Sequence, residues 1–81
     1  MWYVYILECN DKTLYTGITK SLTERLKRHN QGKASKYTRA RLPVKMLFSE
    51  PHETKTSALK REHQLKKLTR AKKLVLIQKN Q

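Results

Sequence analysis

The chain opens with a continuous run of β-branched and aromatic residues, followed by segments with strand and helix patterns. Residues 2–7 form this unbroken run, which is typical of a strand covered on both faces. Asn10 and Asp11 mark a turn, and residues 13–18 predict a second strand that pairs antiparallel with the first. Gly17 within it indicates either a bulge or a place where another backbone or a ligand comes close.

A helix is predicted next, because residues 21–24 read Ser-Leu-Thr-Glu, a capping-box sequence. In this motif the Ser21 hydroxyl caps the Glu24 amide, and the Glu24 carboxylate reaches back to the cap. We expect the helix to run to about Gln31, with Gly32 as its stop signal. An arc of about 100° on this helix holds two apolar anchors and two polar groups, namely Leu22, Arg25, Leu26 and His29.

The second half of the chain predicts one more strand and two more helices. Residues 32–43 are expected to be a long loop, and residues 44–48 alternate like a strand that Pro51 closes. A helix is expected from about Ser57, and Thr69 can cap a last one. The order β-β-α-β-α-α predicts an α+β fold with a three-stranded antiparallel sheet flanked by helices.

Length and charge narrow the class of protein. A chain of 81 residues is expected to form a single domain, residues 1–81. Its formal net charge is +13, divided into +6 for residues 1–41 and +7 for residues 42–81. A small domain that is basic throughout most often binds a polyanion, and nucleic acid is the first candidate.

Other classes are disfavoured by the sequence. The longest apolar run, residues 2–7, is far shorter than the ~20 residues of a membrane span. Cys9 is the only cysteine, which excludes an internal disulfide and fits a reducing cytoplasm. The three histidines His29, His52 and His63 have no zinc spacing relative to it. We therefore expect a cytoplasmic protein that uses neither a membrane nor a structural zinc.

Glu62 is the position that departs most from the hydrophobic pattern. Ala58, Glu62 and Leu65 follow the spacing i, i+4, i+7, so the carboxylate lies in the middle of an apolar helix stripe. A carboxylate there is costly unless it is paired or binds a metal. Two interpretations stay open: an ion pair with Arg25 or a lysine, or a ligand for Mg²⁺, which often takes only one or two protein carboxylates.

Arg25 and His29, one helical turn apart, form a second unusual pair. Arg25 can simply extend along the sheet-facing surface, and His29 can be an ordinary packed histidine. In a basic domain with one inward glutamate, the pair also suits a phosphodiester site, because arginine offers a fork of donors to phosphate oxygens. Tyr5 and Tyr15 lie on the same sheet face only if the turn has the right length, since a slip of one residue reverses every side chain.

The segment of residues 36–41 interleaves cations with an aromatic ring. Phosphate contacts and base stacking would require this composition, although short basic segments are common. Its candidate nucleic-acid-binding residues are Lys36, Tyr37, Arg39 and Arg41.

Together these residues resemble the GIY-YIG nuclease family, in particular its small, stand-alone bacterial members. Tyr3-Val4-Tyr5 stands at the first motif and Tyr15-Thr16-Gly17 at the second, joined by a short hairpin. The resemblance extends from residue 2 to about residue 77. It differs at the leading position of the first motif, which is Tyr3 here where the family has glycine.

The resemblance implies a hydrolytic nuclease that uses one divalent metal ion, Mg²⁺ or Mn²⁺. It suggests Tyr5 as the group that activates water, with Tyr15 beside it. It further implies that Arg25 stabilises the transition state, that His29 supports it, and that Glu62 holds the metal. Because a phenol has a pKa near 10, Tyr5 needs the metal and nearby cations to act as a base at neutral pH.

Three functions follow as alternatives. The first is a metal-dependent endo- or exonuclease acting in repair or processing of DNA that is branched, nicked or single-stranded; DNA is favoured over RNA. The second is a non-catalytic nucleic-acid-binding module, which the +13 charge supports. A third, binding to a membrane surface through the lysine-rich C-terminal helices, is disfavoured by the capping signals and the inward Glu62. A protein partner or a homodimer stays open.

Overall fold

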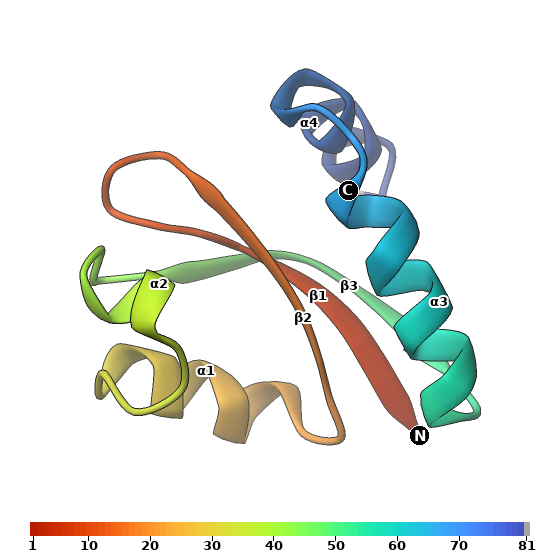
Figure 1. The fold of residues 1–81 in the computed structure, drawn as a ribbon, viewed down its shortest axis with the longest axis horizontal. Coiled ribbons are helices and arrows are strands. Elements are labelled where there is room, and N and C mark those ends of the chain that lie inside the picture. The colour runs from red at the N-terminus through yellow and green to blue at the C-terminus, as the bar shows by residue number, and fades with distance from the viewer. Residues whose placement is uncertain (81) are drawn as a thin grey trace.

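The apolar run at the start of the chain becomes the central strand of a three-stranded antiparallel sheet in the computed structural model, which describes residues 1–80 (Figure 1). β1 (Trp2–Glu8) lies between β2 (Leu14–Thr19) and β3 (Lys45–His52). The middle of β1 is buried on both faces, as its unbroken pattern predicts. The expected fold class is therefore confirmed; Gln81, the last residue of the expected domain, lies outside the described residues.

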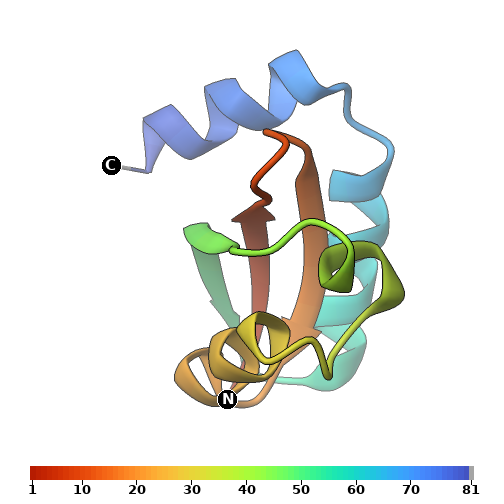
Figure 2. The same ribbon diagram turned by 90° about the vertical axis from the view of Figure 1, so that its left-hand side faces the viewer.

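Helices cover both faces of this sheet (Figures 1 and 2). One face carries α1 (Leu22–Asn30) and the short α2 (Lys36–Arg39). The other carries α3 (Lys55–Lys66) and α4 (Arg70–Lys79). None of these helices combines the length and hydropathy that crossing a bilayer requires.

Alternation along β1 divides the core into two layers. Val4 and Ile6 pack on the α3 and α4 side, in a cluster completed by Phe48, Ala58, Leu65 and Ile77. Tyr5 and Leu7 face the α1 side, where Leu22 and Leu26 cover them. The polar groups that the sequence places on the inward face of α1 therefore meet the Tyr5 face of the sheet.

The predicted helix signals are largely present. Ser21 caps α1 by accepting a hydrogen bond from the Glu24 N–H at 3.3 Å, and Thr69 caps α4 in the same way. Gly32 follows α1 with φ +76°, a conformation that glycine adopts without strain. The prediction that the Glu24 carboxylate reaches back to the cap is wrong. The Ser21 N–H donates to the Thr19 hydroxyl instead, at 3.1 Å.

Three predicted boundaries are corrected by the structure. The expected loop of residues 32–43 contains α2, which is too short for a hydrophobic period and is capped by Ser35. β3 continues through Pro51 to its end, because an edge strand tolerates a residue that cannot donate a backbone hydrogen bond. The helix expected from Ser57 begins two residues earlier, at Lys55, with Thr54 as its N-cap.

Candidate active site

The register of the β1–β2 hairpin decides where the tyrosines lie. Tyr5 pairs with Gly17 and Leu7 pairs with Tyr15, so Tyr5 and Tyr15 are diagonal neighbours on the face that α1 covers. Their ring centroids are 6.5 Å apart. The connection of residues 9–13 therefore brings both tyrosines to one face without placing them directly opposite each other.

Gly17 provides the space that the Tyr5 ring occupies. A Cβ atom at Gly17 would lie 2.6 Å from the Tyr5 hydroxyl and 2.8 Å from Cζ, far inside van der Waals contact. The expected bulge is absent, since β1 and β2 pair without a shift; the register shift lies between β1 and β3, at Ile6 and Leu7. The close approach that the glycine permits is that of a phenol from the neighbouring strand.

A chain of hydrogen bonds runs from the sheet through α1 to α2. The Tyr5 hydroxyl lies 2.9 Å from Nε2 of His29, and Nδ1 of His29 lies 2.8 Å from the Thr38 hydroxyl. Thr38 donates its own hydrogen to the Ser35 carbonyl at 3.3 Å, so it accepts from Nδ1–H. Nε2 of the neutral imidazole is then an acceptor, and Tyr5 donates to it.

Burial keeps this chain neutral. His29 is 1% exposed, and this burial, together with the nearby Arg25, lowers the pKa of the imidazole below its usual value. Burial also raises the pKa of the Tyr5 phenol well above its usual value, with further contributions from Tyr15 and Glu62, while Arg25 acts in the opposite direction. At neutral pH the hydrogen between Tyr5 and Nε2 of His29 therefore stays on the phenol oxygen.

Tyr15 and His29 close the cluster from the side. Their ring centroids are 5.3 Å apart in an edge-to-face arrangement, and Tyr5 and His29 are 5.9 Å apart. Arg25 is near enough to change the pKa of both Tyr5 and His29. Four of the five predicted catalytic residues therefore lie together: Tyr5, Tyr15, Arg25 and His29.

Glu62 approaches the same cluster from α3. Its position between buried Ala58 and Leu65 leaves its side chain 17% exposed, and its charge contributes to the raised pKa of Tyr5. Oε2 of Glu62 lies 3.4 Å from Nζ of Lys66, so the ion pair with a lysine that the sequence left open is present. The pair is of the i,i+4 type, and Lys66 is largely exposed.

The donor set restricts which metal could bind at Glu62. Within residues 1–80 no group of three or more His, Cys, Asp or Glu side chains comes together. A structural zinc site, with four protein ligands, therefore does not fit. A single part-buried carboxylate does fit Mg²⁺ or Mn²⁺, which can complete their coordination with water and phosphate oxygens.

The predicted nucleic-acid-binding residues are divided between two roles. Lys36 and Arg39 are exposed on α2. Tyr37 stacks on Tyr15, with centroids 6.0 Å apart and planes inclined by 26°. Arg41 packs over the Tyr37 ring at 4.0 Å and donates to Asp11 Oδ2 at 3.0 Å, so its guanidinium holds α2 against the β1–β2 turn.

Thr38 is the residue of this site that the sequence did not single out. It is completely buried and fixes the hydrogen of His29 on Nδ1. The contact depends on the chain reversing at Gly32, which brings α2 back against α1, and no local pattern encodes it.

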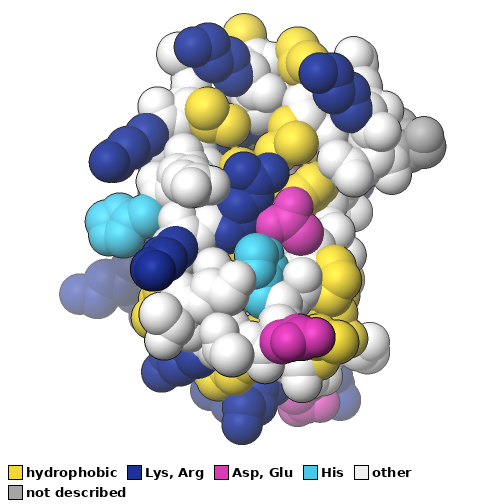
Figure 3. Space-filling view, turned by 90° about the vertical axis from the view of Figure 1, so that its right-hand side faces the viewer, with side chains coloured by type: hydrophobic (Ala, Val, Ile, Leu, Met, Phe, Trp, Pro, Cys, Tyr) yellow, Lys and Arg dark blue, Asp and Glu magenta, His cyan; other side chains and the backbone are white. Residues whose placement is uncertain are grey.

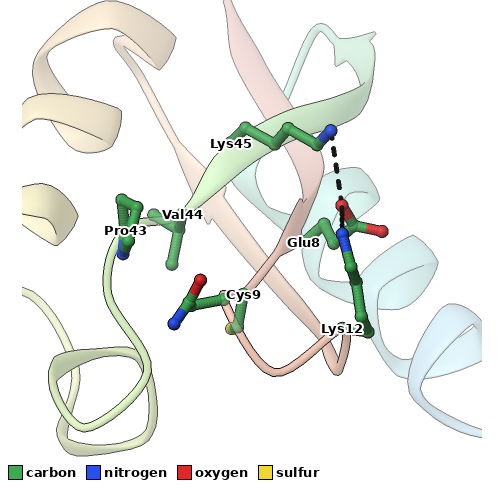
Figure 4. Close-up of a pocket in the computed structure, with 7 residues that line it drawn as sticks. Glu8, Cys9, Lys12, Pro43, Val44 and Lys45 are labelled. Carbon is green, nitrogen blue, oxygen red and sulfur yellow. Dashed lines mark ion pairs between the residues drawn. The ribbon is translucent and has the colours of Figure 1, made fainter.

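A separate pocket of about 250 Å³ lies at the C-terminal end of β1 (Figure 4). Glu8 is held there between Lys12 at 3.8 Å and Lys45 at 3.4 Å. Burial raises the pKa of the Cys9 thiol, so this cysteine is a poor nucleophile. The pocket therefore offers no catalytic group that compares with the Tyr5 cluster.

Comparison with known proteins agrees with this architecture. The family model of the GIY-YIG catalytic domain matches residues 1–75. A UPF0213 protein of Syntrophus aciditrophicus is 54% identical over 79 residues, which cover 96% of this chain and 91% of that protein. A UPF0213 protein of Staphylococcus aureus (strain Mu3) is 49% identical over 75 residues, covering 93% and 92%.

Two solution NMR structures share the fold. That of the UPF0213 protein BH0048 from Bacillus halodurans has a TM-score of 0.61 and 42% identity, covering 96% of this chain and 84% of that one. That of the protein EF2693 from E. faecalis has a TM-score of 0.64 and 40% identity, covering 95% and 82%.

The chain belongs to the GIY-YIG family, as its two tyrosine motifs indicate. Within that family it is similar, along nearly its whole length, to small bacterial proteins that carry the name UPF0213.

Proposed function

We propose that this protein is a metal-dependent nuclease that hydrolyses phosphodiester bonds in DNA, with a role in DNA repair or processing. The observation that carries the proposal is the hydrogen-bonded chain Tyr5–His29–Thr38 beside Arg25. A phenol that donates to an imidazole keeps its oxygen lone pairs available to a water molecule, which is the arrangement that general-base catalysis requires.

In this mechanism the proton of the attacking water moves to the Tyr5 oxygen while the hydrogen of Tyr5 moves to Nε2 of His29. The water oxygen bonds to phosphorus, the P–O bond to the leaving oxygen breaks, and the leaving oxygen takes a proton from solvent. Thr38 holds Nδ1–H, so Nε2 stays free to receive the proton. Arg25 would donate to the phosphate oxygens as their negative charge grows.

Glu62 would hold the divalent metal, Mg²⁺ or Mn²⁺, since it is the carboxylate that contributes to the electrostatics of Tyr5. When bound, such an ion lowers the pKa of water and offsets charge on the phosphate. Tyr15, packed edge-on against His29, would keep the imidazole in place and limit the access of bulk water. Lys36 and Arg39 on α2 would contact the phosphate backbone of the substrate.

The test compares the wild type with Glu62→Ala and with Glu53→Ala, which removes the same charge from an exposed position. Labelled single-stranded, duplex and branched DNA, and RNA, are incubated with Mg²⁺, Mn²⁺ or EDTA. We expect metal-dependent product from the wild type and Glu53→Ala, none from Glu62→Ala, and DNA binding by all three. Cleavage that persists in a pure Glu62→Ala preparation contradicts the assignment of Glu62.

The alternative is a nucleic-acid-binding module that does not cleave. The neutral state of the Tyr5–His29 pair favours it, because the raised pKa of Tyr5 and the lowered pKa of His29 both oppose transfer of the proton between them. The +13 charge supports binding in either case. Saturable binding without product under any metal would select this alternative.

A further inference from the structure

A hollow of about 270 Å³ opens next to the Tyr5 cluster, along β2. This strand lies between α2 and α3 (Figure 1). Six residues line it: Leu14, Tyr15, Thr16, Tyr37, Lys66 and Lys73. Two of them connect it to the candidate active site, since Tyr15 packs on His29 and Lys66 is ion-paired with Glu62. We refer to it as the Lys66/Lys73 pocket.

The charges of this pocket are all positive. Its lining holds two lysines and no carboxylate. Lys73 makes no ion pair within residues 1–80, and burial together with the nearby Lys66 lowers the pKa of its ammonium group. Two cations held close together, one of them partly buried, are stabilised by an anion that lies between them.

Thr16 belongs to the same lining, but its hydroxyl is not open to the pocket. The residue is 3% exposed, and its hydroxyl oxygen, which has no hydrogen-bond partner among the described residues, is closed to solvent. A ligand of this pocket would therefore be held by Lys66 and Lys73, and an anion with several oxygen acceptors can pair with both.

The aromatic side of the pocket, formed by Tyr15 and Tyr37, favours a phosphate over a stacked base as that ligand. Tyr37 uses its ring for contacts with Tyr15 and with the Arg41 guanidinium, which lies 4.0 Å from the ring centroid. The faces of these rings are therefore already occupied. Their edges can contact a sugar of the ligand while the two lysines bind its phosphate. A small anion alone would not use the apolar side of the pocket, which Leu14 and Tyr15 form.

We propose that the Lys66/Lys73 pocket binds a backbone phosphate of a nucleic-acid strand, next to the phosphate that is cleaved. The location relative to cleavage rests on the proposed nuclease function; the binding of a backbone phosphate does not. Lys66 would then bridge the carboxylate of Glu62 and this neighbouring phosphate. DNA and RNA share this chemistry, so both are used as probes.

The experiment measures binding in EDTA, where no metal-dependent cleavage interferes. Lys73→Met keeps most of the aliphatic stem and removes the charge; Lys72→Met removes the same charge from a neighbouring exposed position on α4. Fluorescein-labelled 12-nucleotide DNA and RNA single strands are titrated by anisotropy from 50 to 200 mM salt. We expect Lys73→Met to weaken binding about fivefold and to reduce the salt slope by about 0.7, as loss of one phosphate contact does.

Equal effects of Lys73→Met and Lys72→Met overturn the proposal, since affinity would then follow net charge alone. Because Lys73 is partly buried, a second pair repeats the test with two exposed lysines at the end of α3, its last residue and its C-cap: Lys66→Met against Lys67→Met. If the wild type yields no product in the cleavage assay with Mg²⁺ or Mn²⁺, while only the pocket variants lose affinity in EDTA, the nuclease function is refuted and the pocket is kept. If the wild type cleaves DNA but both members of each pair lose the same affinity, the nuclease function is kept and the pocket is refuted.

Discussion

Two histidines of this protein each use both ring nitrogens, yet their surroundings differ. His29 is buried and both of its partners are hydroxyl groups, those of Tyr5 and Thr38. Within residues 1–80, no carboxylate is hydrogen-bonded to it. Its neutral ring therefore holds Tyr5 through a lone pair, and the phenol oxygen keeps its own lone pairs for another ligand.

His52, at the end of β3, lies in an ionic network instead. Its Nε2 is 2.7 Å from Glu50 Oε1, and its Nδ1 is 2.7 Å from the Ser57 hydroxyl. The same oxygen of Glu50 accepts from Arg61 at 3.0 Å. Figure 3 shows acidic, basic and histidine side chains side by side on this side of the molecule. These contacts attach the edge strand to the first turns of α3.

The comparison shows that two saturated histidines can have different uses. A carboxylate can only accept hydrogen bonds, and Oε1 of Glu50 accepts from both His52 and Arg61, so both donors are paired within this network. The phenol of Tyr5 has capacity left over, and it lies beside the charges of Arg25 and Glu62. We therefore propose a reactive role for the His29 cluster and a structural role for the His52 cluster.

The largest expected effect comes from removing the Tyr5 hydroxyl at His29. Removal of the Ser57 hydroxyl at His52 is the matched control. Tyr5→Phe removes the proposed base, so we expect the single-turnover cleavage rate to fall about 10³-fold, within the range for general acid–base groups. Ser57→Ala removes the hydroxyl at Nδ1 of His52 and should leave the rate within about twofold. A Tyr5→Phe protein that cleaves like the wild type, or a Ser57→Ala protein that fails to cleave, would reverse the two assignments.

Gly17→Ala is expected to have the next largest effect. The added Cβ would meet the Tyr5 hydroxyl at 2.6 Å, so the ring must shift from the position in which it bonds to His29. Overpacking of this kind costs about 1–3 kcal/mol of unfolding free energy, and we expect cleavage to fall about 10²-fold with it. Urea unfolding and cleavage assays give the two values. An unchanged rate would mean that the position of the Tyr5 hydroxyl is not important for the reaction.

Thr38→Val should have a smaller effect on the same cluster. The variant keeps the shape of the side chain but leaves Nδ1–H of His29 without its acceptor, which costs about 1–3 kcal/mol. We expect cleavage to fall about tenfold, because the imidazole loses its fixed orientation. Urea unfolding and single-turnover cleavage of Ser57→Ala provide the matched comparison at His52. Equal stability losses in the two variants would show that burial of His29 adds nothing to its hydrogen bonds.

Local signals in the sequence predict much of the fold. The β1 pattern, the Ser21 and Thr69 caps and the Gly32 stop each depend on a few neighbouring residues. The four-residue α2 has no such signal beyond its cap at Ser35, so the sequence predicts a loop there. Pro51 gives a clear local signal that predicts the end of the strand. The signal misleads because β3 is an edge strand, where a proline is compatible with pairing.

The candidate site was predictable in its members but not in its contacts. The i, i+4 spacing of Arg25 and His29 and the inward Glu62 follow from helical periodicity. The shared face of Tyr5 and Tyr15 depends on the hairpin register, which the pattern left open. The bond between His29 and Thr38 depends on tertiary structure alone.

The smallest expected effect is a pH dependence of stability that originates at His29. Burial and Arg25 lower the pKa of this imidazole in the folded protein, whereas the unfolded chain has the ordinary value of about 6.5. Below about pH 6.5 the unfolded state therefore binds a proton here that the folded state does not. The contribution to the unfolding free energy is complete above that pH and is lost as the pH falls toward the folded pKa.

Urea unfolding of the wild type and His29→Gln at pH 7.5, 6.5 and 5.5 measures this contribution. Glutamine does not titrate, so groups common to both proteins cancel in the difference between them. We expect the wild type to lose up to about 1 kcal/mol more than the variant over this range. Parallel profiles would mean that His29 binds its proton equally well when folded, so that Tyr5 has a charged partner once the pH falls below about 6.5. In that case the contrast between the two histidines would rest on their hydrogen-bond partners alone.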